Sequence, residues 1–212
     1  MALMTKPYYL EALSRANVLP KLAAFDPHVV GTPPLGLDIP TSDIDVICFA
    51  PDADAFTRAI WNAFGGRAGF RMWQKIAGGR AVVATFADVG WVFELFGQGC
   101  QISEQFGWRH FLVERRLLAL GGDIFRAAVM RRRIDGMKTE PAFAAVLGLE
   151  GDPYQALLSL ESCSDLELAS LLREHGFSQN ALTLESRQAA HSGLAEEIGV
   201  TALQSPSELG PQ

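Results

Sequence analysis

Apolar and polar positions in the first part of the chain predict a helix, a short strand and a rigid loop. Residues 8–25 carry apolar side chains at helical spacing, and Pro20 is expected to break or restart this helix. The short stretch His28-Val29-Val30 predicts a strand that ends at Gly31. Three prolines and a glycine in residues 32–41 favour a fixed, irregular loop over a flexible linker.

The next stretch alternates between strand and helix patterns. Residues 43–49 are rich in β-branched side chains and predict a buried strand. Asp52 is expected to cap a helix over 53–64, and Gly65-Gly66 to end it. Three further strands, with a hairpin signal at Gly78-Gly79, are predicted at 69–76, 80–87 and 91–96.

From residue 100 onward the spacing of apolar residues is helical. Helices are predicted at 103–120, 124–134, 140–147, 153–160 and 165–175. The pattern as a whole predicts an α+β fold, in which a mixed β-sheet with flanking helices is followed by a helical C-terminal part. We expect an α/β core over 1–99, a helical region over 100–192 and a loosely ordered tail over 193–212, where large apolar residues are few.

Composition narrows the class of protein without naming a partner. Of the 212 residues, 49% are hydrophobic, as in ordinary globular proteins, and the net charge of −6 neither demands nor excludes nucleic acid. Three widely spaced cysteines without a Cys-x-x-Cys pair argue against a disulfide framework or a zinc site. The sequence contains no signal core and no apolar run near the ~18 residues of a membrane span. We therefore expect a cytoplasmic protein of bacterial type with no membrane partner.

Candidate chemistry lies at the start of the strand over 43–49. Side chains alternate along a strand, so Asp43 and Asp45 point the same way, roughly 6.5–7 Å apart, while Ile44 and Val46 point to the other face. Two carboxylates at this spacing can converge on one Mg²⁺ ion, which proteins hold with one or two carboxylates plus substrate phosphates. Glu94 is a third acidic residue to explain, because a charge inside an apolar strand is costly unless paired or bound to metal.

The order of these elements resembles the nucleotidyltransferase, or polymerase-beta-like, superfamily. The matching residues are Val30-Gly31-Thr32, then Asp43-Ile44-Asp45-Val46 after ten residues, then Glu94 on a later strand. The strings 30–33, 42–45, 96–98 and 138–143 further resemble an uncharacterised bacterial family that is placed in this superfamily as a domain of unknown function.

The resemblance implies a metal-dependent nucleotidyltransferase. Asp43, Asp45 and Glu94 would bind Mg²⁺ or Mn²⁺, and Glu94 would also help to deprotonate the acceptor hydroxyl. The nucleotide would contact the backbone N–H groups of Gly31 and Thr32, together with Ser42 and Lys138. The enzyme would transfer a nucleoside monophosphate from a nucleoside triphosphate to a small molecule, a protein hydroxyl or an RNA end, and release pyrophosphate.

Several residues leave alternatives open. Glu94 is as easily explained by an ion pair with Arg80 on the neighbouring strand, and Lys138 by an exposed lysine beside a helix cap. Gln98, Gln105, Arg109 and His110 follow the Glu94 strand and are candidates to line the cleft, although a packed or capping role is commoner for a histidine. The four tryptophans are most simply core residues, and solvated side chains best explain Arg131-Arg132-Arg133.

The sequence also departs from the superfamily pattern. Thr32 stands where serine is usual, and no arginine follows the Gly-Thr pair to bind the leaving phosphates. The alternative function is therefore a protein of the same fold that binds a nucleotide or a partner without turnover.

Overall fold

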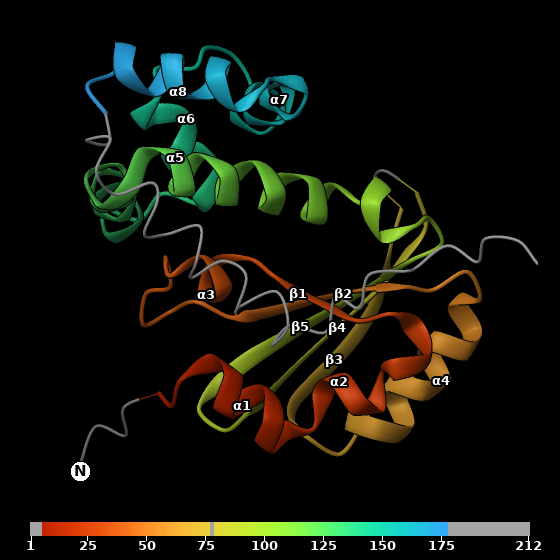
Figure 1. Ribbon diagram of the computed structural model, residues 1–212. Coiled ribbons are helices and arrows are strands. Elements are labelled where there is room, and N and C mark those ends of the chain that lie inside the picture. The colour runs from red at the N-terminus through yellow and green to blue at the C-terminus, as the bar shows by residue number, and fades with distance from the viewer. Residues whose placement is uncertain (1–5, 77–78, 178–212) are drawn as a thin grey trace, which may run out of the picture. The chain divides into compact units, whose positions relative to one another are not determined.

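A five-stranded mixed sheet forms the centre of the N-terminal part. The computed structural model describes residues 6–76 and 79–177, all of them in one compact unit. The strand order is β1-β2-β5-β4-β3; β2 and β5 are parallel and the other neighbours are antiparallel (Figure 1). The strands are β1 (His28–Val30), β2 (Ile44–Phe49), β3 (Ala68–Lys75), β4 (Ala81–Asp88) and β5 (Trp91–Gln98).

One face of the sheet, which we call the closed face, is covered by helices. These are α1 (Tyr9–Ala16), α2 (Val18–Lys21), the 3₁₀ turn η1 (Ala23–Phe25) and α4 (Ala53–Phe64) (Figure 1). The Phe86 ring stacks between Phe64 at 4.8 Å and Phe93 at 5.0 Å, measured between ring centroids. Phe56 packs so close to Gly97 that a Cβ there would lie 2.1 Å from the ring. Glycine at position 97 therefore lets α4 lie tightly against β5.

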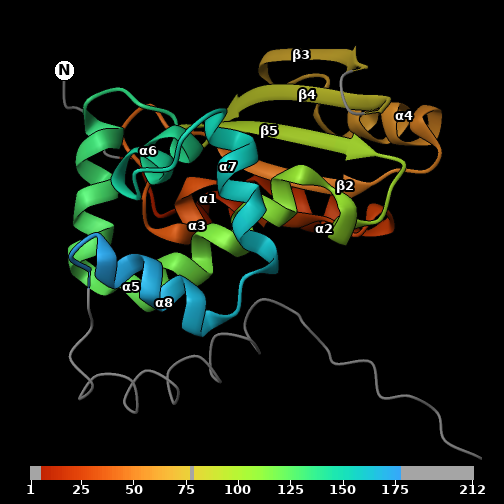
Figure 2. The ribbon, with the colours of Figure 1, turned by 90° about the horizontal axis from the view of Figure 1, so that it is seen from above.

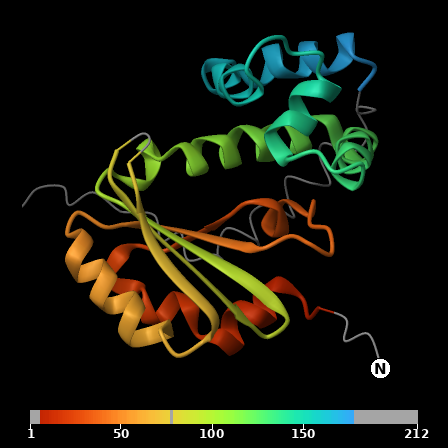
Figure 3. The ribbon, with the colours of Figure 1, turned by 180° about the vertical axis from the view of Figure 1, so that it is seen from behind.

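The helical part forms a second core beside the other face of the sheet, which we call the open face (Figure 3). Its longest helix, α5, is kinked at Gly122, whose φ of 63° and ψ of −158° interrupt the helical backbone. The kink accounts for the two separate helices that the sequence predicts there. The elements are α3 (Thr32–Leu35), η2 (Ile102–Glu104), α5 (Phe106–Ile134), α6 (Thr139–Val146), α7 (Pro153–Ser159), η3 (Leu160–Ser162) and α8 (Asp165–Glu174).

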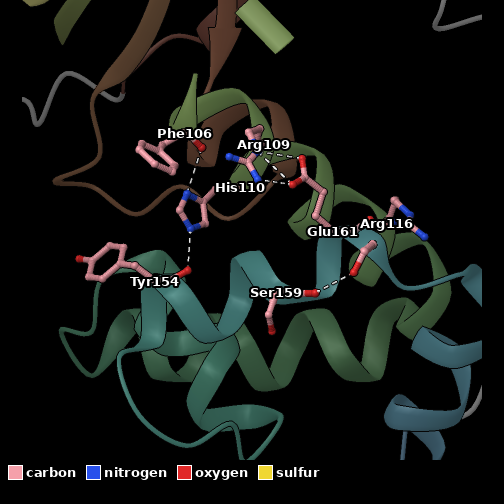
Figure 4. A network of polar contacts seen from close by, with 8 residues as sticks. Phe106, Arg109, His110, Arg116, Tyr154, Ser159 and Glu161 are labelled. Atoms are coloured by element: carbon pink, nitrogen blue, oxygen red, sulfur yellow. Dashed lines mark hydrogen bonds and ion pairs between the residues drawn. The ribbon is translucent and has the colours of Figure 1, made fainter. Parts of the chain in front are cut away.

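A polar network joins α5 to the elements that follow it (Figure 4). Arg109 Nε donates to both carboxylate oxygens of Glu161 at 3.0 Å. The two His110 ring nitrogens lie 3.0 Å from Phe106 O and 2.9 Å from Tyr154 O. Arg109 and His110 thus hold α7 and η3 against α5, which agrees with the packed role that the sequence favours for His110 and does not support a place for Arg109 in the cleft.

Gln105 has a similar structural role at the start of α5. Its side chain is 1% exposed, and Nε2 donates to Cys48 O at 3.0 Å and to Cys100 O at 3.2 Å. These bonds fasten the end of β2 to the chain that enters α5, so Gln105 does not line a cleft either.

The α+β fold class expected from the sequence is confirmed, and most helix ends follow their predicted caps. Asp52 caps α4 by accepting from Asp54 N and Ala55 N, and Ser164 forms the capping box of α8. The early helix, however, breaks at Asn17, whose φ is 56°, and not at Pro20, which lies inside α2.

Two other local expectations need correction. The proline-rich stretch contains the one-turn helix α3, because its prolines stand at the first helical positions, where proline is tolerated. The assignment of all four tryptophans to the core is wrong for Trp61 and Trp73, which are 60% and 43% exposed. The domain boundary expected after residue 99 stays a prediction, and the predicted tail lies outside the described residues.

Candidate functional site

Asp45 and Glu94 lie in one row across the open face, and we call these two residues, together with Asp43 just before β2, the acidic row. Asp45 on β2 pairs in register with Glu94 on the parallel strand β5. Both alternate with residues of the closed-face core, which orients their side chains to the open face. The row continues from Glu94 to Thr85 on β4 and Arg71 on β3, and Val30 on β1 lies beside Asp45. Sheet pairing thus brings together two carboxylates that are 49 positions apart in the chain.

Asp43 lies immediately before β2, at the next alternate position from Asp45. Asp45 and Glu94 both experience its charge. Burial raises the pKa of the Asp45 carboxyl well above its usual range, and the charges of Asp43 and Glu94 raise it further. Burial and the Asp43 charge likewise raise the pKa of Glu94. The fully ionised cluster is therefore disfavoured unless a cation neutralises it.

Gly31 is required by the position of Asp45. Its φ is +77°, a conformation that L side chains rarely adopt, and a Cβ at this position would lie 2.2 Å from Asp45 Oδ2. The glycine therefore leaves room for the carboxylate next to the turn that follows β1. The predicted contact between the Gly31 N–H and a phosphate stays a prediction.

The buried hydroxyls of Thr32 and Ser42 connect the Gly31 turn with the residues that precede Asp43. Thr32 Oγ1 donates to Ser42 Oγ at 3.2 Å, and Ile39 N donates to the same oxygen at 2.9 Å. Thr32 and Ser42 are each 6% exposed. Both side chains therefore stabilise the loop between β1 and β2, which fixes where Asp43 enters the strand. Their predicted contacts with a nucleotide remain to be tested.

An arginine that the sequence pattern did not indicate lies beside this loop. Arg133, near the end of α5, places Nη2 3.5 Å from Ser42 Oγ and donates from Nη1 to Met137 O at 3.0 Å. Arg131 and Arg132 are exposed, as expected for solvated arginines, but that expectation is wrong for Arg133, which is half-buried. The rotational phase of α5 decides which of the three faces the sheet, and the run of arginines alone does not reveal it.

Lysines surround the acidic row. Lys6 Nζ donates to Ser42 O at 2.6 Å and lies near Asp43. Lys138 is exposed immediately before α6, and its charge, like that of Lys75, acts to lower the pKa of Glu94. These positive charges would favour an anionic ligand beside the carboxylates.

The alternative partner of Glu94 is not seen. Arg80 lies beside Asp54, with 4.0 Å between Nη2 and Oδ1, at the other end of β5. In the described structure no ion pair joins Arg80 to Glu94. A surface hollow of about 710 Å³ also lies at that far end, where Arg80, Asp54 and Gln98 line it, and it does not include the acidic row.

The acidic row fits a hard divalent cation in the nature of its donors. All are carboxylate oxygens, and burial, with a further contribution from their mutual repulsion, raises the pKa of both Asp45 and Glu94. Across residues 6–76 and 79–177, no three His, Cys, Asp or Glu side chains are gathered closely enough to form a complete metal site. The arrangement suits a cation held by one or two carboxylates and completed by a phosphate ligand.

Comparisons with solved structures give distant likenesses. A structure described as "structure of GLD-2/RNP-8 complex" has 12% identity and a TM-score of 0.49, over 79% of this chain and 75% of that chain. A structure described as "Structure and function of the polymerase core of TRAMP, a RNA surveillance complex" has 15% identity and a TM-score of 0.42. That match covers 79% of this chain and 56% of that chain. At these scores, neither likeness bears on activity or substrate.

No curated protein matches the chain. Among the described helices, none is long and apolar enough to cross a membrane.

A family model matches residues 11–160, which include every residue of the acidic row and its surrounding loops. The chain belongs to the family described as "Domain of unknown function (DUF4269)".

Proposed function

We propose that the protein is a metal-dependent nucleotidyltransferase, which transfers a nucleoside monophosphate from a nucleoside triphosphate to an acceptor hydroxyl. The observation that carries this proposal is the in-register pair of Asp45 and Glu94 on parallel strands, with Asp43 at the next alternate position. The close approach of Gly31 to the Asp45 carboxylate adds the glycine turn that the superfamily pattern contains. The raised pKa values add an electrostatic demand for a cation.

In this proposal, Asp43 and Asp45 would hold Mg²⁺ or Mn²⁺, and Glu94 would be a further ligand. The bound cation would neutralise the carboxylates and the phosphates. The acceptor oxygen attacks the α-phosphorus, a new P–O bond forms, and the bond to the bridging oxygen breaks to release pyrophosphate. Glu94 would take the proton of the acceptor hydroxyl. Lys138 and Arg133 lie where positive charge would stabilise the phosphates.

The test is release of pyrophosphate from each of the four nucleoside triphosphates with Mg²⁺ or Mn²⁺. Asp45→Asn and Asp43→Asn should lower the rate at least about 100-fold, because each removes a charged ligand without changing side-chain size. Asp54→Asn is the matched control, since Asp54 is an exposed aspartate at the opposite end of the sheet. Full activity in both ligand variants would refute the assignment.

A second candidate function is nucleotide binding without turnover. The observation in its favour is that the described carboxylates do not form a complete three-residue metal site. Thermal-shift measurements separate the two functions, because any ligand that binds the native state raises its stability. Stabilisation by a nucleoside triphosphate with Mg²⁺, together with no pyrophosphate release for any acceptor tested, would favour the binding protein.

A further inference from the structure

The open face continues beyond the acidic row onto β3, where it carries an exposed tryptophan between two cations. Phe70 and Met72 pack against the closed-face core. The alternating residues Arg71, Trp73 and Lys75 therefore lie on the open face. All three are exposed, and Trp73 has 43% of its surface accessible. We call these three residues the β3 platform.

The β3 platform is adjacent to the acidic row. Arg71 is in the same row as Glu94, with Thr85 of β4 between them. Trp73 lies two residues after Arg71 on β3, in register with Val83 of β4 and Phe96 of β5. Two strand spacings and one two-residue step put Trp73 about 12 Å from Glu94. A ligand that extends from the carboxylates across β4 would reach the tryptophan.

No helix of the described chain covers this part of the sheet. α5 packs over β1 and α3, while η2 contacts β2. Seen from above, β3 lies beyond the edge of the helical layer (Figure 2). Within the described part of the chain, the side chains of Arg71 and Lys75 form no hydrogen bond or ion pair, and the Trp73 ring contacts no other ring. The β3 platform is thus an exposed surface beside the acidic row, and no described helix packs on it.

Charged residues on β3 have a simpler purpose as well, because β3 is the outer strand of the sheet. Lysine and arginine on such an edge prevent pairing with strands of other molecules. That purpose does not call for a tryptophan, which is a hydrophobic ring left in contact with water. A flat aromatic ring between two cations instead suits a ligand that combines planar rings with regularly spaced negative charges.

We propose that the β3 platform binds the acceptor, and that the acceptor is a single-stranded nucleic acid. One base would stack on the Trp73 indole, while Arg71 and Lys75 would contact the backbone phosphates on either side. Although the chain carries a net charge of −6, Arg71 and Lys75 give this strand a local positive charge that complements the phosphates of a nucleic acid. The inference rests on the proposed function only for the role of the strand as acceptor, and binding can be measured separately.

Binding is tested with the full chain, without nucleoside triphosphate, by fluorescence anisotropy of a labelled 12-nucleotide single strand. The same mixed sequence is used as RNA and as DNA, to measure which of the two kinds of strand binds more tightly. Trp73→Ala should weaken binding about tenfold, which is the effect of losing one base stack. Trp61→Ala is the matched control, because Trp61 is 60% exposed but packs beside Phe70 on the closed side.

Two further variants distinguish stacking from general attraction to polyanions. Trp73→Phe should retain most of the affinity, whereas Trp73→Leu should lose it, because only phenylalanine keeps an aromatic face. Arg71→Ser and Lys75→Ser should each lower the slope of log affinity against log salt by about 0.7, which corresponds to one phosphate contact.

Three results would overturn the proposal. The first is no binding of either strand by the wild-type protein. The second is equal binding by Trp73→Ala and Trp61→Ala. The third is loss of binding in the arginine and lysine variants alone, since that would indicate a surface for acidic proteins or other polyanions. Pyrophosphate release measured on the same samples separates this proposal from the proposed function, because either property can fail while the other remains.

Discussion

The two faces of the sheet differ in what their side chains contact. On the closed face, β2, β4 and β5 contribute mainly buried apolar side chains, which pack against helices, and the one charged residue, Asp88 at the end of β4, is paired with Arg67. On the open face, the same three strands carry Asp45, Thr85 and Glu94, and part of β3 has no cover. Because strand side chains alternate, the same strands pack apolar residues against helices on one side and carry these polar and acidic residues on the other.

The comparison also explains the unusual electrostatics. Asp45 and Glu94 are partly buried, but neither forms an ion pair in the described structure. Such an arrangement lowers stability, since the buried charges repel one another. A protein that uses its closed face for folding can tolerate this on the open face, where a cationic ligand would compensate it.

The largest expected difference between the faces is in the free energy of unfolding. Phe93→Ala should lower it by about 3–5 kcal/mol, because Phe93 is fully buried and stacked on Phe86. Val92→Ala, one residue away on the open face and 47% exposed, should change it by less than about 0.5 kcal/mol. Urea unfolding of both variants measures the contrast, and similar losses would contradict the assignment of faces.

A smaller loss is expected at the glycine turn of the open face. Gly31→Ala should lower the free energy of unfolding by about 1–3 kcal/mol, through its positive φ and its contact with Asp45 Oδ2. Gly66→Ala is the control, because a Cβ there meets nothing within 4 Å. Combining Gly31→Ala with Asp45→Ala should recover part of the loss, and strict additivity of the two would show that the contact is unimportant.

Removal of one charge from the acidic row should have the opposite sign. Asp45→Asn should raise the free energy of unfolding at pH 8 by about 1–3 kcal/mol, because the buried, repelled charge is gone. The raised pKa of Asp45 means that its stabilising contribution is complete below the unfolded pKa of about 4 and is lost as pH rises through the folded value. The gain from Asp45→Asn should therefore grow with pH, which thermal unfolding between pH 4 and 8 would measure.

A divalent cation should reduce the gain in stability that Asp45→Asn brings. Added Mn²⁺ should stabilise the wild-type protein more than Asp45→Asn, since only the wild type keeps the full ligand charge. Glu114→Gln is the control: Glu114 is 3% exposed and lies within α5, and burial raises the pKa of its carboxyl well above the usual range. That variant should also alter the pH dependence, but it should keep the response to Mn²⁺. An identical response in all three proteins would argue against a cation at Asp45.

The smallest expected effect concerns the arginine beside the motif loop. Arg133→Met should lower the free energy of unfolding by about 0.5–1.5 kcal/mol, since it removes the bond to Met137 O and the contact with Ser42. Arg132→Met, at an exposed position of the same helix, should have almost no effect. If Arg133 also neutralises phosphate, its variant should reduce stabilisation by a nucleoside triphosphate with Mg²⁺ more than the control does.

Much of the local structure could be predicted from the sequence. Helix α4 has the predicted limits, cap and buried residues, because its capping and periodicity depend on neighbours within a few positions. The Asp-x-Asp pattern indicated correctly that Asp45 lies on a strand and faces away from the core. Burial is the main cause of the raised pKa of Asp45, and the repulsion by Asp43 that the sequence predicts adds to it.

Other features depend on which segments meet in the fold. Glu94 was equally compatible with Arg80 or with Asp45 as its neighbour, and only the parallel pairing of β2 with β5 decided between them. The phase of the long helix α5 selected Arg133 from three consecutive arginines. The exposure of Trp73 followed from its place on an outer strand without a covering helix, which no local pattern records.

The sequence by itself thus determined most of the secondary structure and the orientation of Asp45 on its strand, because spacing and alternation are properties of a single segment. The tertiary structure decided that Gly31 makes room for Asp45, that Arg133 lies beside the motif loop and that Trp73 faces solvent beside the acidic row. These features depend on strand register and helix phase, which are set by packing between distant parts of the chain.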